Sequence, residues 1–69
     1  MPEELKDCCD RLRTEIENLK DQVFPLRQHK DSAGEVGANI TLAFRNLEDA
    51  RMRLGKAIQA LDRRPPERI

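Results

Sequence analysis

The sequence predicts an all-α protein: an antiparallel hairpin of two helices that assembles into a helical homo-oligomer. Apolar residues recur at steps of three and four in two blocks, and a single block of proline, glycine and polar residues separates them. The assembly follows from size and polarity. In a chain of 69 residues, with 38% hydrophobic and 38% charged side chains, one core supplies no more than about 3–5 kcal/mol. We therefore expect copies of the chain to cover one another's apolar stripes.

The first helix is expected over about residues 3–24. Proline and two acidic residues open the block, which suits the first turn of a helix. Pro25 has no amide hydrogen and disfavours helical geometry at Phe24, so the helix should end there. Adjacent helical residues point about 100° apart, so one of the two cysteines should fill the apolar stripe and the other should lie at its edge. The stripe consists of Leu5, Cys8 or Cys9, Leu12, Ile16, Leu19, Val23 and Leu26.

A turn is expected over about residues 25–38, followed by a second helix over about 39–62. Ser32 and Glu35 have the spacing of a capping box, which would allow a start as early as Ala33; Asn39 is a second candidate cap. The second helix should end near residue 62, before two arginines and two prolines. Residues 1–62 then form one hairpin domain and 63–69 a flexible tail. The second stripe consists of Ile40, Ala43, Phe44, Leu47, Ala50, Leu54, Ala57, Ile58 and Leu61.

Composition excludes several classes of protein. No run approaches the roughly 18 apolar residues of a membrane span, and the first residues do not resemble a signal peptide, so we expect a cytoplasmic protein. The two cysteines and the single His29 do not form a zinc ligand set. No grouping of base and nucleophile is apparent, and Phe24 and Phe44 are the only aromatic residues. We therefore expect no enzymatic activity, no metal and no cofactor.

Candidate binding residues lie in the turn and at the start of the second helix. Arginine and lysine donate charge-assisted hydrogen bonds to phosphates, threonine and asparagine can bind a base or ribose, and a helix start offers backbone amides to anions. A solvated loop beside an exposed helix face is the simpler interpretation and stays open. A basic patch (Arg51, Arg53, Lys56, Arg63 and Arg64) could contact nucleic acid, but the zero net charge of the chain argues against nucleic acid as a partner. The candidate ligand-binding residues are Arg27, His29, Lys30, Asn39, Thr41 and Arg45.

Residues 38–58 also carry a resemblance to a known family. Their pattern is similar to L-A-x-x-x-L-E-x-A-x-M-x-L-x-K-A, a segment of the helical-hairpin domain of small tailed-phage proteins. The family includes the anti-CBASS sponges and, within larger proteins, the anti-Thoeris sponges, and the resemblance covers roughly residues 30–61. The matching positions are Leu42, Ala43, Leu47, Glu48, Ala50, Met52, Leu54, Lys56 and Ala57.

The resemblance implies a phage protein that performs no chemistry. Members of the family form compact oligomers, commonly hexamers, and sequester cyclic oligonucleotide immune messengers in pockets between protomers, where basic and hydroxyl side chains hold the ligand. For this chain we expect capture of cyclic di- or trinucleotides in the cytoplasm of a bacterial host, by a hexamer or alternatively a dimer or tetramer. The main alternative is a structural or adaptor hairpin that binds a protein helix.

Overall fold

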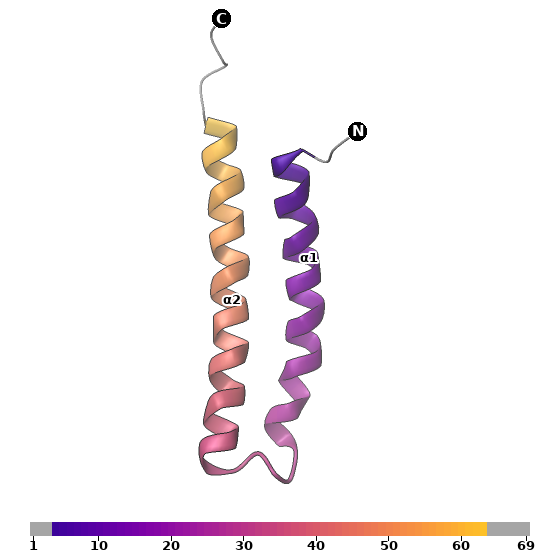
Figure 1. Ribbon diagram of the computed structural model, residues 1–69, viewed down its shortest axis with the longest axis vertical. Helices are drawn as coiled ribbons and strands as arrows, with labels where there is room; N and C mark the ends of the chain where they lie inside the picture. Colours follow the sequence, from indigo (N-terminus) through magenta and orange to yellow (C-terminus); the bar gives the residue numbers. More distant parts are fainter. Residues whose placement is uncertain (1–3, 64–69) are drawn as a thin grey trace, which may run out of the picture.

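The computed structural model describes residues 4–63, and these residues form a helical hairpin (Figure 1). Helix α1 spans Leu5–Val23, a short 3-10 helix η1 spans Phe24–Gln28, and helix α2 spans Gly34–Arg63. The described part of the chain contains no β-strand. Figure 1 shows α1 and α2 side by side and antiparallel, joined at one end by the turn. The expectation of an all-helical hairpin is confirmed. The expected start near residue 3 and the tail beyond residue 63 lie outside the described residues.

Helix α1 ends where the proline requires it to end. Its last α-helical residue is Val23, and Pro25 lies in the first turn of η1, where a missing amide hydrogen costs little. At the other end, the backbone of Glu4 is extended and its carbonyl accepts the amide of Cys8 at 2.9 Å, which closes the first turn. The predicted end near residue 24 is therefore confirmed.

Helix α2 begins at Gly34, five residues before the start at residue 39 that we favoured from the sequence. Neither expected cap acts as one: the Ser32 hydroxyl donates to the Leu26 carbonyl, and the Asn39 amide donates to the Glu35 carbonyl at 2.8 Å within the helix. Gly34 instead supplies the left-handed backbone (φ +60°) that turns the chain into the helix.

The two helices pack in a constant register. Cross-helix contacts join Lys6 to Asp62 at 3.3 Å, Glu17 to Arg51 at 3.0 Å and Lys20 to Glu48 at 3.6 Å. The rings of Phe24 and Phe44 lie 5.6 Å apart. In each pair the two residue numbers sum to 68. Along the hairpin axis, each residue of α1 therefore lies at the same height as the residue of α2 whose number is 68 minus its own.

The interior of the hairpin is small. Among the described residues, only Cys9 and Ile58 are buried hydrophobic residues, and no polar side chain is fully buried. Cys8 is half-buried, which confirms the expectation that one cysteine fills the stripe and the other lies at its edge. The two helices form a single layer, with Cα atoms spanning 12 Å along the shortest axis, so all the remaining side chains of residues 4–63 are at least partly exposed to solvent.

Candidate functional site

The turn places three of the candidate residues at one end of the hairpin. Arg27 belongs to η1, and its guanidinium lies 5.3 Å from the centre of the Phe24 ring, a cation–π contact. His29 and Lys30 follow directly and are exposed. Because the Phe24 ring in turn contacts Phe44 of α2, the aromatic pair fixes the position of η1 against the second helix.

A local hydrogen bond orients His29. Its Nδ1 atom accepts the backbone amide of Asp31 at 3.0 Å, and the Asp31 carboxylate lies 3.7 Å from the same nitrogen. Since Nδ1 accepts a hydrogen bond, the proton of the neutral ring lies on Nε2. His29 therefore offers an Nε2–H donor in the turn of the hairpin, one residue before Lys30.

The turn is held in this shape by a close backbone approach. A Cβ atom at Gly37 would overlap the carbonyl oxygen of Ser32, so only glycine allows the first turn of α2 to lie against the loop. The Ser32 hydroxyl bridges back to Leu26 in η1. These contacts determine where the exposed cations of the turn lie relative to α2.

The remaining candidates lie on α2 but do not share one side of it. Asn39 and Thr41 are two residues apart, so their side chains project about 160° from each other on a helix. Thr41 and Arg45 are four residues apart and share a side; Thr41 is half-buried and Arg45 is exposed. One protomer thus brings together Arg27, His29 and Lys30 in the turn and Thr41 with Arg45 on α2, but it does not bring Asn39 to the side of Thr41.

The cations differ in whether an acidic side chain neutralises them. Along the body of the hairpin, basic residues form ion pairs of 3.0–3.9 Å, including those of Arg51, Arg53 and Lys20. Within residues 4–63, no acidic side chain forms an ion pair with Arg27, Lys30 or Arg45. The turn end of the hairpin therefore presents positive charge that is available to an anion.

Two arginines of the basic patch considered from the sequence are paired with acidic side chains. Arg51 pairs with Glu17 across the helices, and Arg53 pairs at 3.9 Å with Asp49, four residues earlier in α2. Arg63 donates to the carbonyl of Gln59, and Arg64 lies outside the described residues. The pairing of Arg51 and Arg53 weakens the nucleic-acid interpretation, whereas Lys56 forms no ion pair within residues 4–63.

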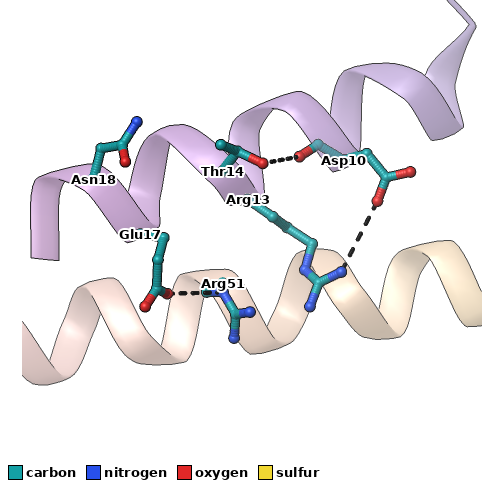
Figure 2. Close-up of a pocket in the computed structure, with 6 residues that line it drawn as sticks. All are labelled: Asp10, Arg13, Thr14, Glu17, Asn18 and Arg51. Carbon is teal, nitrogen blue, oxygen red and sulfur yellow. Dashed lines mark hydrogen bonds and ion pairs between the residues drawn. The ribbon is translucent and has the colours of Figure 1, made fainter.

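Sequence reasoning missed a polar groove between the helices, which Figure 2 shows in close-up. The groove has a volume of about 330 Å³, and Arg51 of α2 reaches across it to Glu17. Arg13 crosses toward α2 at the level of Gly55, and its buried Nε atom has no hydrogen-bond acceptor within the described part of the chain. Only the register between the helices could have revealed this groove. Its lining residues are Asp10, Arg13, Thr14, Glu17, Asn18 and Arg51.

Other kinds of site find little support in residues 4–63. No three histidine, cysteine, aspartate or glutamate side chains there are grouped so as to hold a metal ion. No helix in that range combines the length and the hydropathy that crossing a membrane requires.

Comparison of the chain with protein-family models, with curated proteins and with solved structures finds no match.

Proposed function

We propose that the chain is a phage-encoded sponge, which captures cyclic oligonucleotide messengers in pockets between protomers and does not cleave them. The observation that carries the proposal is a group of cations at the turn end that form no ion pair with any acidic residue of the described range 4–63: Arg27, Lys30 and Arg45. Guanidinium and ammonium groups are the usual ligands of phosphodiesters. The resemblance of residues 38–58 to the sponge family supports the same assignment.

The division of the polar candidates supports a pocket between copies. Thr41 and Asn39 project to different sides of α2, so a single small ligand contacts both only when they come from different protomers. In such a pocket Arg27 and Lys30 bind phosphates, while the Thr41 hydroxyl and the Asn39 amide hydrogen-bond to ribose or base edges. Arg45 adds either a bidentate phosphate contact or a planar surface on which a base stacks. We propose a hexamer, with a dimer or tetramer as the alternatives, acting in the cytoplasm of the bacterial host.

The binding claim is tested by isothermal titration calorimetry with a panel of cyclic di- and trinucleotides. Sequestration requires a Kd below the messenger concentration, and a Kd in the tens of nanomolar corresponds to about −10 kcal/mol. We expect at least one member of the panel to bind in this range and to be recovered intact by chromatography after the protein is denatured. No heat of binding across the panel, or recovery of a hydrolysed product, contradicts the proposal.

A matched pair of variants tests the location of the site. Arg45→Ala should weaken binding by about tenfold or more, the loss expected for a charge-assisted contact, without dissociating the oligomer. Lys56→Ala is the control, because within residues 4–63 Lys56 also forms no ion pair with an acidic residue but lies on α2 far from the turn. Equal effects of the two substitutions would place the ligand elsewhere.

One observation favours the alternative, an adaptor hairpin that binds a protein partner. Leu5, Leu12 and Leu19 of α1 are exposed, and such apolar surface often marks a protein interface. This alternative predicts a stable hetero-complex and no response to any nucleotide. The calorimetric titrations with the nucleotide panel separate the two functions, because an adaptor hairpin should bind none of the nucleotides.

A further inference from the structure

A row of exposed leucines runs along one side of the hairpin. Leu5, Leu12, Leu19 and Leu26 are seven residues apart, and their exposed fractions are 64%, 40%, 46% and 47%. Seven residues fall about 20° short of two full helical turns, so the leucines of α1 lie nearly on one line. They flank the contact with α2, at which Lys20 lies 3.6 Å from Glu48 and near which Cys9 is buried. The row is an apolar surface that one protomer leaves uncovered.

Helix α2 extends this apolar face. A groove of about 510 Å³ has an apolar floor of Leu12, Ile16 and Leu19 of α1 with Leu54 of α2, and its lining also includes the polar residues Glu15, Asn18 and Gln22. Residues three and four apart share a side of a helix, so Ala50 and Ala57 lie beside Leu54. Continuing at the same seven-residue spacing, Ala43 completes a row of small residues. The face, which we call the leucine face, therefore carries a row of large residues on α1 and a row of small residues on α2.

The leucine face lies away from the polar groove of Figure 2. Leu12 is two residues from Asp10 and Thr14, and Leu19 is two residues from Glu17, so each pair projects to nearly opposite sides of α1. The hairpin thus has one face of paired charges and one of exposed leucine.

We propose that the leucine face binds a second copy of the chain, with α1 of each copy antiparallel to α2 of the other. The two copies are related by a two-fold axis parallel to the helices, and together they form a four-helix bundle. The proposal specifies a contact between copies that the proposed function requires, but its test involves no nucleotide, so the two can fail separately.

The register of the hairpin fits this arrangement. A two-fold rotation about an axis parallel to the helices does not move a residue along that axis. Each residue of α1 therefore keeps its height, and the partner's α2 residue at that height again has the number that brings the sum to 68. Leu12 then lies level with the partner's Ala57, and Leu19 with the partner's Ala50. Leu26, in η1 just beyond α1, lies level with the partner's Ala43. In each of these pairs the residue numbers sum to 69, one more than the register sum of 68. These three leucines each meet a small residue, which allows close packing of the helices, whereas Leu5 lies level with Arg63, beyond the alanine row.

The charges at the rim agree with the same arrangement. Glu15 lies beside Leu12 and Leu19 on α1, on the edge remote from its own α2. Arg53 lies beside Ala50 and Ala57 on α2, also on the outer edge. Because 15 and 53 sum to 68, Glu15 lies level with the partner's Arg53, and this contact of opposite charges would add to the pairs that Glu15 makes with Arg11 at 3.2 Å and Arg53 with Asp49 at 3.9 Å. If α1 lay on the partner's α1 instead, large residues would meet large ones, and the alanine rows would leave gaps.

The test uses two variants that should fail alone and recover when mixed. Leu19→Ala removes the large residue and should weaken self-association by about tenfold or more; Ala50→Leu places two large residues in one layer and should weaken it similarly. In an equimolar mixture the heterodimer pairs a large residue with a small one in both of its symmetry-related contacts between positions 19 and 50. We expect sedimentation equilibrium and native mass spectrometry to show the heterodimer in excess over both homodimers.

A second pair keeps the packing unchanged. Glu15→Arg and Arg53→Glu each set like charges against each other in the homodimer, and a mixture of the two variants restores both opposite-charge contacts. The control is Met52→Ala, because Met52 is an exposed apolar residue on α2 that lies outside the leucine face, two residues from both Ala50 and Leu54. It should leave self-association unchanged. A wild-type chain that stays monomeric, homodimers unaffected by the leucine-face variants, or mixtures that do not favour the heterodimer each overturn the proposal.

Discussion

Substituting alanine for each of the three glycines in turn should change the stability of the hairpin with different signs. At Gly34 a Cβ atom would meet no neighbouring atom within 4 Å, but the backbone is left-handed, with φ at +60°. An L-residue in that conformation costs about 1–2 kcal/mol, so Gly34→Ala should lower the free energy of unfolding by that amount. At Gly37 the backbone is ordinary, but a Cβ atom would overlap the carbonyl of Ser32, so the turn must shift and stability should again fall.

At Gly55 the opposite result is expected. A Cβ atom there would lie 3.5–3.6 Å from the guanidinium of Arg13, which is ordinary van der Waals contact. Alanine is preferred over glycine within a helix, so Gly55→Ala should stabilise the hairpin by about 0.5–1 kcal/mol.

Urea denaturation followed by far-ultraviolet circular dichroism measures these changes, with every variant at one protomer concentration because assembly contributes to stability. Gly34→Asn is the control: asparagine is larger than alanine but tolerates the left-handed region better, so it should cost less. If Gly34→Asn costs more than Gly34→Ala, or if Gly55→Ala destabilises the protein, the reading of these three positions is wrong.

Two further predictions concern the contact between the helices. Ile58→Ala should destabilise the hairpin by about 2–5 kcal/mol and Ile58→Val by about 0.5–1.5 kcal/mol, because Ile58 is one of the two buried hydrophobic residues of the described chain; equal losses in thermal unfolding would show that burial does not set the cost. Lys20, only 14% exposed, lies 3.6 Å from both Glu17 and Glu48 and 5.4 Å from the centre of the Phe44 ring. Lys20→Met retains the length and removes the charge, so it should cost about 1 kcal/mol at low salt and less at high salt. A loss that does not depend on salt would assign the role of Lys20 to packing alone.

The fold follows from the sequence because its signals are local. The three-and-four spacing of apolar residues predicts both helices, and Pro25 predicts the end of the first. The favoured start of α2 at residue 39 was wrong, whereas the alternative start near Ala33 lies next to the observed Gly34. Ser32 and Asn39 have the side chains of caps but donate to the carbonyls of Leu26 and Glu35 instead. Sequence spacing shows that a cap is available, whereas the backbone of the turn decides whether it forms.

The candidate site was predictable only in part. The sequence placed Arg27, His29 and Lys30 together correctly, because they are neighbours in the chain. The cross-helix pairs of Glu17 with Arg51 and of Lys20 with Glu48 depend on the register between the helices, which no local pattern determines. The same register decides which cations are neutralised and which are not.

The pairing of Lys6 with Asp62 has a practical consequence for how the protein is handled. Since these residues lie 3.3 Å apart, Leu5 and Arg63 occupy the same end of the hairpin, opposite the turn (Figure 1). A biotin tag or fluorescent label fused before Leu5 or after Arg63 is therefore joined to the hairpin at that end. Surface immobilisation through a terminus would therefore leave Arg27 and Lys30 pointing into the solution, where an analyte can reach them.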